Sequence, residues 1–228
     1  MSTLWLSKAR LRRDREAVAA LSAVLVPTDG PARVAASHHL VWALFAGNRE
    51  RRRDFLWREE APGRFLVLSA EPPGDGGGLC EVESREFAPQ LASGDRLGFL
   101  LRANPVVSRG EPGSSRGKRH DVVMDALRHH PQHERAALRL PLVAEAGAAW
   151  LRRQGERHGF ALEDTPACDG YETVRLPRKG GEKALRFSQV DFSGVLRVTD
   201  PALFLTAITQ GFGHARAFGC GLMLIRRV

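Results

Sequence analysis

The carboxyl-terminal residues 210–227 constrain the fold most, because they impose the order helix, glycine loop, strand. This segment holds two Gly-x-Gly pairs, formed by Gly211, Gly213, Gly219 and Gly221. Asp200 and Pro201 predict a helix that begins with an N-cap and stops at Gly211. An apolar, strand-like run follows at residues 222–226. Glycine tolerates positive φ, so the loop can bring its backbone close to a bulky ligand.

Two nucleotide-binding motifs do not fit this loop. A dinucleotide fingerprint needs strand before helix and a third glycine where Arg216 stands, and a P-loop needs Gly-Lys-Ser/Thr. His214 and Arg216 lie between the glycine pairs and give the loop a basic character. An ordinary glycine-rich turn is the alternative interpretation of the segment.

The charge balance predicts a polyanionic partner. The chain has 228 residues, a formal net charge of +8 and a pI of about 10.4. A basic domain most often binds nucleic acid, and less often an anionic membrane surface. An Arg-rich protein without such a partner is the alternative. The hydrophobic content of 43% excludes general disorder, and the length allows one large domain or two small ones.

The cysteines indicate a reducing compartment. Cys80, Cys168 and Cys220 are odd in number, far apart and without Cys-x-x-Cys spacing, which is typical of free thiols in a cytoplasmic protein. Basic residues interrupt the amino terminus, so no signal peptide is expected. No apolar run approaches membrane-spanning length.

Periodicity and turn signals predict an α+β protein with two units. The first unit has the outline of a ferredoxin-like βαββαβ motif, and residues 87–91 are its only candidate for a second helix. Its other elements are expected at residues 4–11 (strand), 32–46 (helix), 54–58 and 64–70 (hairpin), and 95–103 (strand). Residues 106–120 are predicted to form a basic loop. A helix at 142–158 and strands at 160–162, 171–176 and 183–198 begin the second unit. We expect domains at residues 1–105 and 141–228, joined by a linker region at 106–140.

Two histidines in the first helix are candidates for proton transfer. Imidazole is the side chain best suited to exchange protons near neutral pH. His38 lies at the edge of the apolar stripe that contains Trp42 and Phe45, and His39 is turned about a quarter of the helix away. The alternatives are a half-buried core histidine for His38 and a solvent-facing one for His39.

A histidine group in the linker region resembles metal-ligand spacing. His129 and His133 would share one helix face, but Pro131 between them breaks such a helix. No His-Glu-x-x-His motif occurs in the chain. A polar loop without a metal is therefore the favoured interpretation.

Two basic clusters predict contacts with nucleic-acid phosphates. The first surrounds Gly180-Gly181 in a predicted hairpin and consists of Arg175, Arg178, Lys179, Lys183 and Arg186. The second consists of Arg102, Arg109, Arg116, Lys118 and Arg119. Few aromatic residues lie between the cations, which favours backbone or groove contacts with a folded duplex over base stacking. A solvated charged hairpin is the alternative.

Several of these motifs together resemble a known family. They are Leu-Arg-Ala-Asn-Pro at residues 101–105, the spacing His38-x-x-x-Trp42-x-x-Phe45, and the double Gly-x-Gly segment. In this order, over nearly the whole chain, they resemble the CasE-type CRISPR RNA endoribonuclease, the repeat-processing subunit of the type I-E Cascade complex.

The resemblance implies two tandem ferredoxin-like (RAMP-type) domains and a metal-independent ribonuclease without a cofactor. Such an enzyme cuts CRISPR transcripts at the base of a repeat stem-loop by 2′-hydroxyl attack. It then stays bound to the 3′ handle of the mature CRISPR RNA, together with the other Cascade subunits. A stem-loop-holding Cascade subunit with weak or no catalysis is the alternative.

The resemblance also implies roles for individual residues. His38 matches the catalytic histidine of the family, as acid or base, and His39 is a candidate to assist it. Several relatives carry a tyrosine one helical turn earlier, where this chain has Ala35, and a basic residue where it has Ala43. The only tyrosine here is Tyr171. The expected RNA-binding residues are Arg102, Lys118, Arg119, Arg175, Arg178, Lys179, Lys183, Arg186, Gly211, Gly213, His214, Arg216, Gly219 and Gly221.

Overall fold

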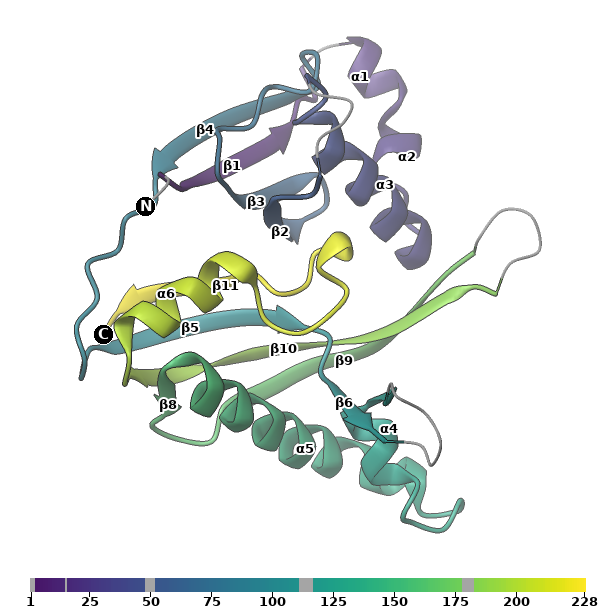
Figure 1. The fold of residues 1–228 in the computed structure, drawn as a ribbon. Helices are drawn as coiled ribbons and strands as arrows, with labels where there is room; N and C mark the ends of the chain where they lie inside the picture. Colours follow the sequence, from purple (N-terminus) through teal and green to yellow (C-terminus); the bar gives the residue numbers. More distant parts are fainter. Residues whose placement is uncertain (1–2, 15, 48–51, 111–116, 178–182) are drawn as a thin grey trace. The chain divides into compact units, whose positions relative to one another are not determined.

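The computed structural model describes residues 3–14, 16–47, 52–110, 117–177 and 183–228. Its contacts divide the chain into two compact units, each assembled from separate stretches of sequence (Figure 1). The first unit contains residues 1–90, 174–186 and 215–222. The second contains residues 91–173, 187–214 and 223–228. The glycine-rich segment is thus shared between the two units.

The first unit is built on an antiparallel sheet with the strand order β2-β3-β1-β4. Its strands are β1 (Trp5–Leu11), β2 (Phe55–Ala61), β3 (Arg64–Ser69) and β4 (Cys80–Glu86). Its helices are α1 (Glu16–Ala20), α2 (Ser22–Leu25) and α3 (Gly30–Ala43). Alternation along β1 turns Ala9 and Leu11 into a core shared with Phe65 and Val67 of β3 and Val41 of α3.

The second unit is built on a sheet with the order β11-β5-β10-β8, and β9 pairs with β10 beside it. These strands are β5 (Arg96–Ala103), β8 (Phe160–Leu162), β9 (Ala167–Leu176), β10 (Leu185–Val198) and β11 (Met223–Arg227). The other elements are β6 (Val106–Arg109), β7 (Lys118–Asp121), α4 (Val122–Leu127), α5 (Arg135–His158) and α6 (Pro201–Gln210). Figure 1 shows β9 and β10 as a long two-stranded ribbon.

Both main sheets have the same topology. In the first unit the strands in chain order are β1, β2, β3, β4, and in the second they are β5, β8, β10, β11. Numbered in this way, the strands of each sheet lie in the spatial order 4-1-3-2, the arrangement that results from a split βαβ repeat. The α+β class and the two ferredoxin-like domains are therefore confirmed.

Local signals predicted several elements well. Asp200 accepts hydrogen bonds from the amides of Ala202 and Leu203, each at 3.0 Å, and α6 ends at Gly211 as expected. The hairpin around Pro62-Gly63 is also confirmed as β2–β3.

Other local interpretations were wrong. Residues 87–91 are not helical, and β4 was not predicted at all. The strand expected at 95–103 lies in the second sheet, between β10 and β11, and does not complete the first. Within the predicted loop at 106–120, the described residues form the hairpin β6–β7. The partners of β4 and β5 are distant in sequence, so local periodicity does not reveal their pairing.

Candidate active site

Helix α3 positions both candidate histidines in the first unit. The Asp29 carboxylate accepts a hydrogen bond from the amide of Ala32 at 2.9 Å and caps the helix. Leu40 and Val41 are buried in the core. Because successive helical residues are about 100° apart, His38 falls at the edge of this buried face and is half-buried, whereas His39 is exposed. The position predicted for His38 at the edge of the apolar stripe is confirmed.

A carbonyl of the glycine-rich segment fixes the His38 ring. His38 Nδ1 lies 2.7 Å from the carbonyl oxygen of Ala217, which also accepts from Trp57 Nε1 at 3.2 Å. A carbonyl oxygen only accepts, so Nδ1 carries the proton and donates it. In the neutral ring, Nε2 is then the nitrogen with a free lone pair. The Phe218 ring, with its centroid 5.3 Å from that of His38, packs against the imidazole.

The glycine-rich segment needs its glycines to reach this position. The four glycines all have positive φ, as the sequence predicted: Gly211 78°, Gly213 75°, Gly219 82° and Gly221 96°. At Gly219, a Cβ atom would lie 3.1 Å from Cζ3 of Trp57, closer than an ordinary carbon contact. Glycine therefore lets the 3₁₀ turn η2 (Arg216–Phe218) lie against Trp57 and His38.

The electrostatic surroundings of His38 favour its neutral form. Burial lowers the pKa of His38, and the nearby His39 and Arg53 lower it further, against the opposing effect of the Ala217 hydrogen bond. The pKa of the Arg53 guanidinium is itself lowered, by desolvation and then by the charge of Arg216. Two arginines and an imidazole with a free Nε2 therefore belong to one electrostatic cluster.

The predicted RNA-binding residues of the second unit lie in three places. Arg102 forms a two-pronged ion pair with Asp191 across β5 and β10, at 3.0 and 2.7 Å. Lys118 and Arg119 are exposed on β7. A loop places Gly213 and His214 against Asn104, where a Cβ on Gly213 would lie 2.8 Å from the Asn104 carbonyl oxygen.

The predicted basic hairpin is the β9–β10 ribbon. Arg175, Lys183 and Arg186 are exposed on it, as a surface for phosphate contacts requires. Arg178 and Lys179 lie outside the described residues. Arg216, Gly219 and Gly221 belong to the segment that reaches His38 in the first unit.

The histidine-rich turn does not form a metal site among the residues described. The break predicted at Pro131 is confirmed, since α4 ends at Leu127 and α5 begins at Arg135. No group of three or more His, Cys, Asp or Glu side chains in the described segments could hold a metal ion. None of the helices in those segments combines the length and apolar character needed to cross a bilayer.

Two members of the His38 site were missed from the sequence. Arg53 ends a basic run at residues 49–53, which sequence reasoning did not link to His38. The Ala217 carbonyl lies 179 residues from His38 along the chain, and a backbone group has no sequence signature. Only the basic run offered a signal that could have been followed.

Comparison with known proteins identifies the family. A family model described as "CRISPR associated protein" matches residues 4–227. CRISPR-associated endoribonuclease Cse3 of Thermus thermophilus is 32% identical over 194 residues, covering 77% of this chain and 81% of Cse3. The CRISPR system Cascade subunit CasE of Escherichia coli is 26% identical over 192 residues, covering 82% of this chain and 88% of CasE.

A solved structure agrees. Thermus thermophilus Cse3, bound to an RNA that represents a pre-cleavage complex, superposes with a TM-score of 0.68 at 25% identity and covers 98% of this chain and 99% of its own. The shared topology, the length of the match and the identity to Cse3 lead to one assignment. The chain belongs to the CRISPR-associated family of CasE and Cse3, whose members include endoribonucleases.

Proposed function

We propose that this protein is an endoribonuclease that cleaves CRISPR precursor transcripts within the repeat, at the base of a stem-loop. The observation that carries the proposal is the His38 ring, held through Nδ1–H by the Ala217 carbonyl with Nε2 free. The relative Cse3 is named an endoribonuclease, and it has been solved bound to RNA. After cleavage the protein remains on the 3′ handle as a subunit of Cascade, as CasE is named. Its place of action is the cytoplasm, where the transcript is made.

The reaction uses a nucleophile that the RNA itself supplies. His38 Nε2 removes the proton from the 2′-hydroxyl, whose oxygen attacks the adjacent phosphorus in line. The bond from phosphorus to the 5′-oxygen breaks, and the leaving oxygen takes up a proton. The products are a 2′,3′-cyclic phosphate and a 5′-hydroxyl, without a metal or cofactor. Arg53 and Arg216 stabilise the negative charge that develops on the phosphate.

The remaining basic residues hold the RNA. We place the phosphates of the stem along the β9–β10 ribbon and β7, where the described cations are exposed. Arg102 is oriented by Asp191, and the backbone around Gly213 and Gly221 lies close to the RNA strand. The proposed contacts are Arg102, Lys118, Arg119, Arg175, Lys183, Arg186, Gly211, Gly213, His214, Gly219 and Gly221.

The test is cleavage of a labelled repeat RNA in EDTA by the wild type, His38→Ala and His39→Ala. We expect one cut at the base of the stem, a loss of about 10²–10⁴-fold in rate for His38→Ala, and a change of only a few-fold for the exposed His39→Ala control. RNA binding should persist in both variants. Equal loss in the two variants would contradict the role of His38.

One observation favours a second function. Ala35 stands one helical turn before His38, where several relatives have a tyrosine, so a group that assists the reaction is absent. A subunit that holds the stem-loop without efficient cleavage would bind the same RNA tightly. Tight binding with no cleavage by the wild type would select this function.

A further inference from the structure

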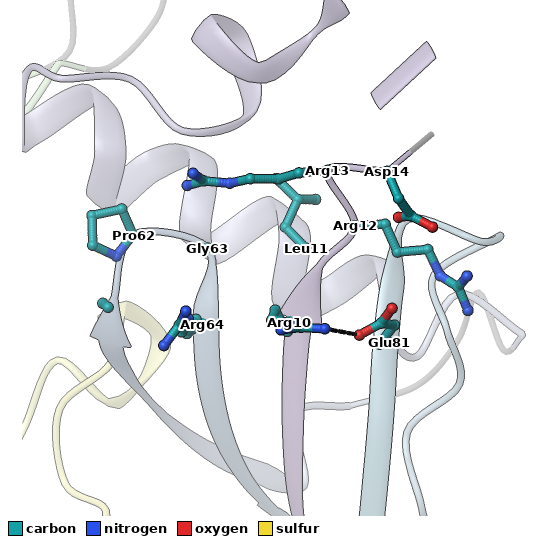
Figure 2. A pocket seen from close by; sticks show the side chains of 10 residues that line it. Arg10, Leu11, Arg12, Arg13, Asp14, Pro62, Gly63, Arg64 and Glu81 are labelled. Atoms are coloured by element: carbon teal, nitrogen blue, oxygen red, sulfur yellow. Dashed lines mark hydrogen bonds and ion pairs between the residues drawn. The ribbon is translucent and has the colours of Figure 1, made fainter. Parts of the chain in front are cut away.

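A basic pocket lies at the end of the first sheet, where β1 ends and β3 begins. Its volume is about 650 Å³, within the range of pockets that hold small ligands. All of its lining residues belong to the first unit. The polar ones, drawn in Figure 2, are Arg10, Arg12, Arg13, Asp14, Arg64 and Glu81. None of them belongs to the His38 site, so the pocket is a separate feature.

The strand register explains why the pocket is basic. Arg10 on β1 is directly opposite Arg64 on β3 and opposite Glu81 on β4. The Glu81 carboxylate accepts from Arg10 Nε at 3.2 Å and also from its Nη2, and this pair raises the pKa of Arg10. Glu81 therefore neutralises Arg10 but not Arg64. The row Arg64–Arg10–Glu81 has two positive charges and one negative charge, so one positive charge is uncompensated. Like charges directly opposite one another also destabilise a sheet.

Two arginines of the pocket are available to a ligand. Arg13 and Arg64 are exposed, and neither forms an ion pair with another described residue. In Figure 2 the Arg13 side chain extends toward Pro62, and Arg64 lies next to Gly63. Arg12 extends to the opposite side, beside Asp14. A negative ligand on the Pro62 side would thus meet two guanidinium groups, near the Glu59 carboxylate that accepts from the Gly63 amide at 3.2 Å.

The backbone that carries these arginines is fixed before any ligand binds. The Leu11 amide donates to the Gly63 carbonyl and the Arg12 amide to the Leu79 carbonyl, each at 2.8 Å. Gly63 has a φ of 75°, and a Cβ there would lie 3.2 Å from Cβ of Leu11. These contacts tie the end of β1 to the β2–β3 turn, which reduces the ordering cost of binding.

We propose that this pocket binds a phosphate group, gripped by Arg13 and Arg64. Guanidinium groups pair with phosphate oxygens through two parallel hydrogen bonds. The phosphate comes either from the strand of a bound RNA, which rests on the proposed function, or from a free nucleotide.

The test compares the double variant Arg13→Gln/Arg64→Gln with the control Lys8→Gln/Arg85→Gln. Both remove two exposed positive charges from the first unit, so both should fold, as a thermal melt would verify. One arm measures binding of a repeat hairpin with single-stranded flanks as a function of salt. The other measures binding of adenosine monophosphate by calorimetry.

For an RNA phosphate, the double variant loses about tenfold in RNA affinity at low salt, and its salt slope falls by about 1.4, or 0.7 for each of two contacts. The control changes less than half as much. If the ligand is a free nucleotide, the double variant loses adenosine monophosphate binding and keeps the RNA affinity of the control. Equal behaviour of the double variant and the control in both arms would overturn the proposal.

The two proposals fail in different ways. If the wild type cleaves repeat RNA normally and the double variant binds like the control, the proposed function holds and the phosphate site is ruled out. If the wild type does not cleave repeat RNA but binds adenosine monophosphate, and the double variant does not bind it, the proposed function is ruled out and the phosphate site holds.

Discussion

At the scale of single residues, the state of the His38 proton determines what this site can do. The Ala217 carbonyl fixes the tautomer with Nδ1 protonated, and burial lowers the pKa. A neutral ring with a free Nε2 is a base. The proposed 2′-hydroxyl attack requires such a group, and an imidazolium could not perform that step.

The pH profile of cleavage follows from this state. A base works only when neutral, so the rate constant should fall as the pH drops through the pKa of His38. Because burial lowers that pKa, the midpoint should lie below about 6.5, the ordinary value for histidine. Single-turnover cleavage between pH 4.5 and 8, in the wild type and in His39→Ala, measures it. A rate that increases as the pH falls would indicate an acid instead.

Arg53 offers a second test at this scale. It affects His38 electrostatically and lies near Arg216, so it is suited to stabilise charge on the phosphate. Arg53→Gln should slow cleavage of bound RNA by about 10²-fold, the lower end of the effect of losing one such donor. Arg52→Gln removes an exposed neighbouring charge and serves as the matched control. Equal effects of the two substitutions under saturating RNA would contradict a specific role for Arg53.

At the scale of elements, the turn η2 connects the glycine-rich segment to α3. Gly219→Ala would force a side chain into a φ of 82° and place its Cβ 3.1 Å from Trp57. We expect a loss of about 1–2 kcal/mol in the free energy of unfolding from the left-handed backbone. We also expect slower cleavage, because the Ala217 carbonyl would shift away from His38. Urea denaturation and single-turnover cleavage measure the two effects.

Gly77→Ala is the control for that substitution. Gly77 has a similar φ of 73°, but a Cβ there would meet nothing within 4 Å. It should therefore lose a similar amount of stability and keep its cleavage rate. A Gly219→Ala protein that cleaves as fast as Gly77→Ala would show that the Ala217 carbonyl does not position His38.

The individual elements show which parts of the fold could be predicted from sequence patterns. Helix α6 was predictable because its N-cap, Pro201 and Gly211 lie within a dozen residues. Strand β4 was not, because its core-facing positions include Ser84 and its other face carries Glu81 and Glu83, so its apolar alternation is faint. The placement of β5 in the second sheet depends on β10 and β11, far along the chain.

The candidate site was also predictable only in part. The position of His38 at the edge of the apolar face was predictable from its spacing to Trp42 and Phe45. Its hydrogen bond to a backbone carbonyl 179 residues away arises only after both ends of the chain have folded into one unit. The burial that lowers the His38 pKa has the same origin, so the sequence left acid and base open, whereas the structure favours the base.

At the scale of the whole molecule, the two units share one sheet topology but carry different candidate residues. Both sheets have the 4-1-3-2 strand order, yet the candidate histidine and the ribbon residues Arg175, Lys183 and Arg186 lie in the first unit, whereas Arg102, Lys118 and Arg119 lie in the second. With a net charge of +8, the molecule attracts RNA over its surface. In the proposed mechanism, cleavage depends on the small cluster around His38, so binding and catalysis should be separable by substitution.

The central claim is that the RNA supplies its own nucleophile to His38. The most direct measurement compares two repeat RNAs in EDTA, identical except for a 2′-deoxy nucleotide immediately upstream of the scissile phosphate. The account predicts that the unmodified RNA yields a 2′,3′-cyclic phosphate end, and that the deoxy RNA binds equally well and is not cut. Cleavage of the deoxy RNA at the same site would contradict the account, because the nucleophile would then be a group other than that hydroxyl.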